Sequence, residues 1–228
     1  MNRNFDYQWG NVGSSSQCNE TYRGPRAASE PEVQAVQNYM RSIFEDRRDD
    51  DLSDPAPRDY QGIYIDIHSY GEIIYQPRNS PNDRDITTLN RRMAFYNGYR
   101  PVLSKLESIS RVENTDFPKQ ASENHDIFNH TYSFGYGDLG VPSYLIELGT
   151  AFFQRCSYFE SNIVPKNFGA LTYALKSVRA PYITPAGPET IELKIENSTL
   201  SGIVDDGRLS TRSGRGSIQN IKAAEYYI

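Results

Sequence analysis

The chain has 228 residues, 37% of them hydrophobic and 23% charged, with a formal net charge of −5. This length and composition exclude a disordered chain and fit one sizeable domain with a small appendage. The acidic balance, with no basic block, excludes a surface for nucleic acid, and no apolar run reaches the roughly 20 residues of a membrane span. We therefore expect a monomer with no nucleic-acid partner and no membrane span.

Residues 29–44 predict the first helix. Ser29 and Glu32 have the spacing of a capping box, and Pro31 suits the first turn. Its apolar residues recur at helical spacing and are expected to face a core: Val33, Val36, Tyr39, Met40, Ile43 and Phe44. A charged loop then leads to GIYIDIH, residues 62–68, whose nearly continuous apolar character predicts a strand buried on both faces.

A helix, a strand and another helix follow along the chain. Residues 85–107 predict a helix weakened by Gly98 and Pro101, whereas residues 110–133 show no period. SYLIELG, residues 143–149, predicts a second buried strand. A helix over 165–178 is expected to bury Phe168, Leu171, Ala174, Leu175 and Val178. This alternation indicates an α/β sheet covered by helices.

After residue 182 the pattern changes to short alternating segments. TIELKI, TLSGIV and EYYI are separated by stretches rich in Gly, Ser and Arg. We expect a first domain over residues 1–182 and a partial β-rich module over residues 183–228, joined by a proline-rich linker.

Two polar residues stand in these strands. His68 ends the first strand, and ligands of open α/β sheets bind beyond the carboxyl ends of strands. Taken alone, His68 fits a histidine held by hydrogen bonds better than a metal ligand. Glu147 lies within the second strand, where an ionised carboxylate needs a partner or a cleft.

Four segments in order carry a family resemblance: NRNFDYQWG, SSSQCNETYRGPRAASEPEVQA, DIHSYGEIIYQP and SYLIELGTAFF. Together they resemble the zinc metallocarboxypeptidases of the carboxypeptidase A/B family over about residues 2–182. The resemblance implies the C-terminal part of a mixed, mostly parallel sheet flanked by helices. It also implies hydrolysis of C-terminal peptide bonds with Zn2+ as cofactor, and a secreted, extracellular protein of bacterial type.

The resemblance implies a role for each matching residue. His68 is similar to a zinc ligand, with the adjacent Asp or the backbone fixing its tautomer, and Glu147 to the general base. Asn2 and Arg3 match the pair that binds the C-terminal carboxylate of the substrate. Ser69 and Tyr70 match residues that line the cleft.

Some of these matches also have a purely structural explanation. An isolated Asn2-Arg3 dipeptide would be a solvated terminus, but the whole NRNFDYQWG string favours the family role. Ser69 and Tyr70 fit a strand exit with an ordinary packed tyrosine equally well.

Other family residues have no match here. The HxxE zinc ligands and an arginine of the family lie upstream of its Asn-Arg pair, so we expect Met1 to be internal to a longer reading frame. The second catalytic tyrosine would fall near His125, leaving Tyr132 and Tyr136 as unplaced candidates.

The remaining histidines and cysteines give weaker signals. A substitute zinc site built from His125, His130 and His68 is disfavoured by their spacing. Cys18 and Cys156 can pair with each other, pair elsewhere or stay free.

The leading hypothesis is thus a zinc-dependent metallocarboxypeptidase. A second hypothesis is a zinc-free pseudoenzyme or module that binds peptide C-termini through Asn2 and Arg3. A third is a non-functional fragment in which these residues are remnants.

Overall fold

The structure is a computed structural model that describes residues 2–48, 55–77, 86–102, 130–207, 210–211, 214–215 and 220–225. Its main elements are α1 (Pro31–Ile43), β1 (Tyr64–Ser69), β2 (Ile73–Tyr75), α2 (Thr87–Asn97), β3 (Arg100–Val102), α4 (Thr131–Gly137), β4 (Ser143–Leu148), α5 (Cys156–Tyr158), the π-helix η2 (Phe159–Ile163), α6 (Val164–Ser177), the 3-10 helix η3 (Thr184–Ala186), β5 (Glu189–Glu196), β6 (Thr199–Asp205), β7 (Ser210–Thr211) and β8 (Gly214–Arg215). Within these ranges, no helix has the length and apolar character needed to cross a membrane.

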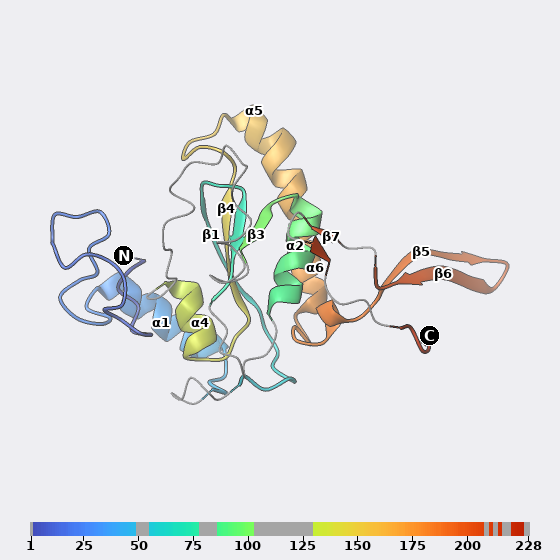
Figure 1. Ribbon diagram of the computed structural model, residues 1–228, viewed down its shortest axis with the longest axis horizontal. Helices are drawn as coiled ribbons and strands as arrows, with labels where there is room; N and C mark the ends of the chain where they lie inside the picture. The colour runs from blue at the N-terminus through green and yellow to red at the C-terminus, as the bar shows by residue number, and fades with distance from the viewer. Residues whose placement is uncertain are drawn as a thin grey trace.

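A four-stranded mixed sheet in the order β1-β4-β2-β3 forms the centre of the molecule. β1 runs parallel to β4 and β2 parallel to β3, whereas β2 and β4 are antiparallel. Helices α1 and α4 lie on one side of the sheet and α2 and α6 on the other (Figure 1). The predicted α/β class, with a mixed sheet flanked by helices, is therefore confirmed.

The two predicted core strands differ in burial. β4 pairs on both sides, and Ser143 through Ile146 are buried, as predicted. β1 is at the edge of the described sheet, and Ile67 is 51% exposed. The prediction that this strand is buried on both faces is wrong, since all its residues are partly or largely exposed.

Strand register divides the sheet into two faces. Partners in register point to the same side, so Asp66 lies with Leu145, and His68 lies with Glu147. A small apolar cluster formed by Ile73, Tyr75, Tyr132 and Leu145 covers part of this face. The opposite face contributes Ile74, Tyr144 and Ile146 to the main core.

Helix α1 buries a narrower stripe than the sequence predicts. Val33, Gln37 and Met40 are buried, whereas Val36, Tyr39 and Ile43 are exposed. The predicted capping box is absent, because Ser29 Oγ instead donates to Glu30 Oε1 at 2.7 Å and accepts from Asn4 Nδ2 at 3.0 Å.

Helix α2 is shorter than predicted. It ends at Asn97 because Gly98 adopts a left-handed conformation, with φ +72°, that stops the helix. Pro101 then lies in β3, in register with Ile74. The predicted helix over 85–107 is therefore wrong beyond residue 97, and residues 103–107 lie outside the described ranges.

Helix α4 was not predicted, since TYSFGYG has no helical period. All seven residues are buried, so tertiary packing rather than intrinsic preference stabilises this helix. Gly135 permits the close packing, because a Cβ there would lie 2.5 Å from Ser143 Oγ.

Helix α6 places Pro165 in its first turn, as predicted, and buries part of the predicted face. Ala174 is buried and Leu171 packs partly buried against the core, as predicted, whereas Phe168 and Leu175 are about 70% exposed, contrary to prediction. The buried positions are Asn167, Ala170, Tyr173, Ala174 and Ser177. Buried Asn167 Nδ2 donates to the hydroxyl of Tyr99 at 2.9 Å, so the inward face of the helix includes a polar side chain with a buried partner.

TIELKI and TLSGIV form the antiparallel hairpin β5–β6, which projects away from the sheet (Figure 1). At its base, buried Glu189 accepts hydrogen bonds from the Tyr173 hydroxyl at 2.7 Å and from Lys176 Nζ at 2.8 Å. These contacts anchor the hairpin to α6. The EYYI segment lies largely outside the described residues, and Cys18 and Cys156 are both free and exposed.

Glu189 gives the hairpin anchor a pH dependence. Burial alone would raise the pKa of Glu189, but the hydrogen bonds from Lys176 and Tyr173 outweigh burial and lower it. A carboxyl whose pKa is lower in the folded state stabilises the fold above its unfolded pKa and loses that contribution as the pH falls through the folded pKa. We expect Glu189→Gln to lower the free energy of unfolding by about 1–3 kcal/mol at pH 7.

Urea unfolding at pH 7 and pH 3 tests this expectation. The deficit of Glu189→Gln should shrink toward pH 3, and Glu196→Gln at the exposed end of the hairpin should change stability little at either pH. If Glu189→Gln lowered the free energy of unfolding equally at both pH values, the contribution of Glu189 would not come from its charge.

Candidate functional site

His68 and Glu147 lie side by side on one face of the sheet. They are partners in the parallel register of β1 and β4, near the carboxyl ends of both strands. The imidazole and the carboxylate therefore share the edge of the sheet where α/β proteins bind ligands. The structure thus places the two side chains on the same face of the sheet.

Backbone and side-chain hydrogen bonds fix the segments that follow these strands. Gly71 N donates to Gly149 O at 2.9 Å, and Gly149 N donates to the hydroxyl of Tyr99 at 3.3 Å. Gly149 has φ +62°, and a Cβ there would lie 2.8 Å from Ile163 Cδ1. This junction keeps the ends of β1 and β4 together.

The His68 ring is held by an acidic neighbour. Its Nε2 lies 3.1 Å from Asp66 Oδ2, an oxygen that also accepts a hydrogen bond from Thr131 Oγ1. The hydrogen bond with Asp66 raises the pKa of His68, against the effect of burial. Burial would raise the pKa of Asp66, but the hydrogen bonds from His68 and Thr131 outweigh it and lower the pKa.

Glu147 has an unsatisfied carboxylate oxygen. Its Oε2 is buried and makes no hydrogen bond with the described residues. Burial raises the pKa of Glu147, although the positive charges of His68 and Arg3 oppose that shift. A carboxylate with a raised pKa and a vacant acceptor oxygen is suited to take a proton from water.

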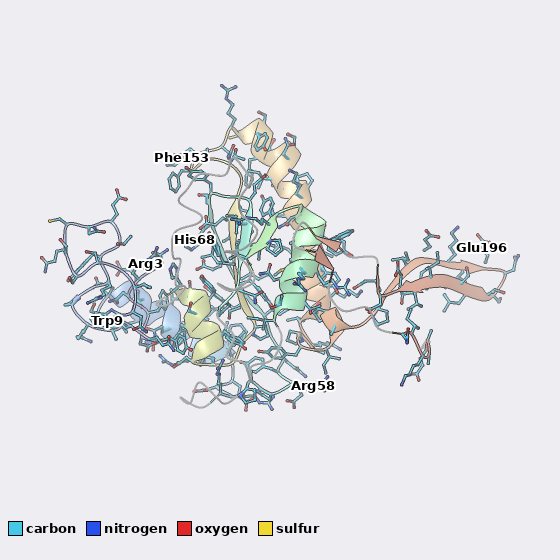
Figure 2. The ribbon with its side chains drawn as sticks, viewed as in Figure 1. Arg3, Trp9, Arg58, His68, Phe153 and Glu196 are labelled. Carbon is cyan, nitrogen blue, oxygen red and sulfur yellow. The ribbon has the colours of Figure 1, made fainter. Side chains whose placement is uncertain are left out.

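Arg3 lies on the same side of the sheet as His68 (Figure 2). Burial lowers the pKa of Arg3, and the negative charge of Glu147 only partly opposes that shift. Its Nη1 donates to the Asn2 carbonyl at 3.1 Å. The half-buried guanidinium retains donors suited to a carboxylate.

Asn4 anchors the segment that carries Asn2 and Arg3. Its side chain is almost fully buried, and Nδ2 donates to the carbonyls of Arg23 at 2.7 Å and Arg26 at 2.9 Å. Its Oδ1 accepts from the backbone N–H of Glu30 at 3.0 Å. These bonds tie the N-terminal segment to the start of α1.

Ser69 and Tyr70 occupy different surroundings. Ser69, with His68, lines a pocket of about 460 Å3. Apolar residues form most of the remaining wall, among them Ile67, Leu148, Phe152, Phe153, Phe159 and Ile163. Tyr70 contacts that wall through an edge-to-face arrangement with Phe152, with ring centroids 4.7 Å apart. A pocket of this volume is large enough for part of a peptide.

The two candidate tyrosines are separated by the structure. Tyr136 belongs to the main core, where the Arg48 guanidinium lies 5.0 Å from its ring centroid. Tyr132 is buried on the face that carries Glu147, and burial raises the pKa of its hydroxyl well above the usual range. Tyr132 is thus the one of the pair beside the site. His125 lies outside the described residues.

Sequence reasoning did not identify Thr131 as part of this site. The residue begins α4, and residues 110–133 gave no periodic signal. Asp66 was visible as the polar exception in an apolar strand, which was a usable signal for a second polar residue on the His68 face. The helix that delivers Thr131 could not be located from pattern alone.

The described residues do not by themselves form a metal site. No three of their His, Cys, Asp and Glu side chains gather closely enough to hold a metal ion. A catalytic zinc ion normally takes three protein ligands and leaves one position open. The His68 imidazole, with Nε2 engaged by Asp66, fits one nitrogen ligand of such a set.

Comparisons with known proteins identify the family of this chain. A family model described as zinc carboxypeptidase matches residues 1–167. Human mast cell carboxypeptidase A is 24% identical over 159 residues, which cover 64% of this chain and 34% of that protein. Carboxypeptidase B of Canis lupus familiaris is 36% identical over 76 residues, covering 33% of this chain and 15% of the relative. The chain thus spans about a third or less of these relatives.

Solved structures show the same fold. Carboxypeptidase A from Helicoverpa armigera superposes with a TM-score of 0.56 and 18% identity, covering 79% of this chain and 42% of that chain. Bovine thrombin-activatable fibrinolysis inhibitor, solved in complex with tick carboxypeptidase inhibitor, gives a TM-score of 0.55 and 22% identity, covering 78% and 56%. Because the family model matches well over half of the sequence, the chain belongs to the zinc carboxypeptidase family.

Proposed function

We propose that the protein is a zinc-dependent metallocarboxypeptidase that hydrolyses C-terminal peptide bonds. In this proposal Glu147 is the general base, His68 is a zinc ligand, and Asn2 and Arg3 bind the C-terminal carboxylate of the substrate. The in-register pairing of His68 with Glu147 carries the proposal, because it sets a metal-binding nitrogen beside a carboxylate with a vacant oxygen.

Arg3 would select the end of the peptide. A guanidinium fork can bind a terminal carboxylate through two hydrogen bonds, and an internal peptide bond offers no such charge. The effect of each of Arg3 and Glu147 on the pKa of the other supports a common site for the two. A carboxylate held at Arg3 would therefore place the last peptide bond near Glu147.

Glu147 would move the proton during hydrolysis. Its raised pKa favours uptake of a proton from the attacking water, and the same carboxyl then gives that proton to the leaving amine. Zinc, when bound, supplies Lewis-acid polarisation and lowers the pKa of water. Ser69 would line the cleft beside His68, and Tyr70 would support its wall through Phe152.

A zinc-free module that binds peptide C-termini is the second candidate. It is supported by the half-buried Arg3 guanidinium, which retains donors suited to a carboxylate. In that case Asn2 and Arg3 would retain carboxylate recognition, and Glu147 would have no catalytic role.

The remaining assignments follow from the family and the chain pattern. We propose residues 1–182 as part of the catalytic domain and residues 183–228 as a β-rich module. The projecting hairpin β5–β6 supports that division (Figure 1). An extracellular, monomeric protein acting on peptide or protein C-termini is proposed by analogy with the family.

Peptide binding tests the role of Arg3. We expect a peptide with a free C-terminal carboxylate to bind more tightly than its C-terminal amide, and Arg3→Gln to weaken binding of the acid roughly 10- to 100-fold by removing charged hydrogen bonds. Fluorescence anisotropy with a labelled peptide measures the affinities for the acid and the amide and the effect of Arg3→Gln.

Arg58→Gln is the charge-matched control, because exposed Arg58 lies far from Arg3 in Figure 2. It should leave affinity for the acid unchanged. Equal affinity of the unaltered protein for acid and amide would remove the proposed carboxylate recognition.

Hydrolysis separates the two candidate functions. The natural gene product, supplied with Zn2+, should release the C-terminal amino acid of a peptide, and Glu147→Gln should slow release roughly 100-fold or more while peptide binding persists. Mass spectrometry of the shortened peptide measures the rate. Acid-selective binding without any release by the unaltered protein would instead support the zinc-free module.

Glu147 also predicts a pH-dependent stability. A carboxyl with a raised folded-state pKa destabilises the fold once it is ionised, and has no effect below the unfolded pKa of about 4.3. We expect Glu147→Gln to stabilise metal-free protein by roughly 0.5–1 kcal/mol at pH 8, allowing for solvent screening of a half-buried group, and by nothing at pH 3.

Urea unfolding in the presence of a chelator measures this difference. Glu160→Gln, at an exposed position, serves as the matched control and should leave stability nearly constant. A loss of stability in Glu147→Gln at pH 8 would show that the carboxylate has a partner in solution.

A further inference from the structure

Three buried polar side chains form a network next to the end of β4. Asn97 ends α2, Tyr99 lies between α2 and β3, and Asn167 belongs to α6. Each of the three residues is at most 6% exposed. Burial of an amide or a hydroxyl costs free energy unless the group is hydrogen-bonded, so the partners of these side chains determine what the network does.

The Tyr99 hydroxyl is the centre of the network. Its oxygen accepts hydrogen bonds from Asn167 Nδ2 at 2.9 Å and from the backbone N–H of Gly149 at 3.3 Å. Asn167 Oδ1 accepts from Asn97 Nδ2 at 3.1 Å, and Asn97 Oδ1 accepts from the backbone N–H of Tyr99 at 2.9 Å. Because each amide is held through both its oxygen and its nitrogen, the hydroxyl has a fixed position beside Gly149.

The network holds the backbone just beyond Glu147. β4 ends one residue before Gly149, and the Tyr99 hydroxyl accepts the hydrogen bond of the Gly149 N–H there. The same turn packs closely against Ile163, since a Cβ at Gly149 would lie 2.8 Å from Ile163 Cδ1. Asn167 Nδ2 also donates to the Ile163 carbonyl at 2.9 Å. One buried amide is therefore bonded both to the hydroxyl that holds Gly149 and to the residue that packs against it.

The position of the Glu147 carboxylate depends on this backbone. Its Oε2 is buried and makes no hydrogen bond with the described residues, so none of their side chains holds that oxygen directly. A general base must lie within hydrogen-bond reach of the proton it takes, and a displacement of about 1 Å can cost roughly 100-fold in rate. A contact that fixes the end of β4 therefore also fixes the reach of Glu147.

We propose that Tyr99, held by the two asparagine side chains, is a positioning residue that fixes the backbone after Glu147 and so aligns this carboxylate for proton transfer. Neither Tyr99 nor the two asparagines line the pocket of about 460 Å3, so they act through Gly149 and not on the substrate. The anchoring of Gly149 follows from the hydrogen bonds of Tyr99, whereas its use in catalysis rests on the proposed function.

Tyr99→Phe removes only the hydroxyl and leaves the Gly149 N–H without its acceptor. In the natural gene product supplied with Zn2+, we expect kcat for release of the C-terminal amino acid to fall roughly 10- to 100-fold, because the base is less well aligned. KM should change by less than about twofold, since the proposed carboxylate recognition comes from Arg3 on a separate segment. Initial rates over a range of peptide concentrations separate the two constants.

Tyr144→Phe is the matched control for loss of a buried hydroxyl. Tyr144 is fully buried on the opposite face of β4, and its hydroxyl donates to the Ile86 carbonyl at 2.9 Å. This variant should lose stability in urea as Tyr99→Phe does, but keep the kcat of the unaltered protein. Both variants are compared at a temperature where circular dichroism shows them fully folded. A purely structural role of Tyr99 would make the two variants behave alike.

Hydrogen exchange of the Gly149 amide tests the anchor without any catalysis. Nuclear magnetic resonance of the 15N-labelled chain should show this amide exchanging roughly 10-fold faster in Tyr99→Phe, because its hydrogen bond is lost, and unchanged in Tyr144→Phe. Asn167→Ala removes the donor that holds the hydroxyl but keeps Tyr99 itself. It should give a smaller increase in exchange and a smaller fall in kcat.

Unchanged exchange of the Gly149 amide in Tyr99→Phe would overturn the proposal, as would an unchanged kcat in that variant when the unaltered protein hydrolyses the peptide. Should Tyr99→Phe fail to fold, the same two measurements on Asn167→Ala decide the question. Failure of the proposed function gives a different result: the unaltered protein would release no amino acid, which removes the catalytic use of Tyr99, while exchange at Gly149 still reports the anchor.

Discussion

The site depends on the parallel register between β1 and β4. Side chains alternate along a strand, so a slip of one residue would send His68 and Glu147 to opposite faces of the sheet. β4 lies between two strands with most of its residues buried, which specifies its register strongly. The hydrogen bonds at Gly149 then secure the end of the pair where the two side chains meet.

Three segments that are far apart in the sequence contribute charged side chains to the site. Because these side chains are partly buried, the charge of each affects the others. Arg3 comes from the N-terminal segment that Asn4 anchors, His68 from β1 and Glu147 from β4. His68 has its carboxylate partner in Asp66, whereas Glu147 retains a vacant buried oxygen. His68 therefore has a fixed partner within the protein, whereas the Glu147 carboxylate has one oxygen left to interact with a ligand or water.

The sequence was informative where function leaves a local pattern. A polar residue at the end of an apolar strand led to His68, and the ordered motifs led to Glu147, Asn2 and Arg3. The edge position of β1 was not predictable, because the same apolar run fits a central strand or an edge strand. The inward face of α6 was also hidden, since it includes Asn167, whose hydrogen-bond partner Tyr99 lies far away in the sequence.

The contacts of Asp66 bear on the choice between a peptidase and a carboxylate-binding module. Recognition of a peptide terminus needs Arg3 and its anchor, and neither requires an oriented imidazole. Asp66 and Thr131 nevertheless hold one nitrogen of His68, although a polar pair on a covered strand face carries a desolvation cost.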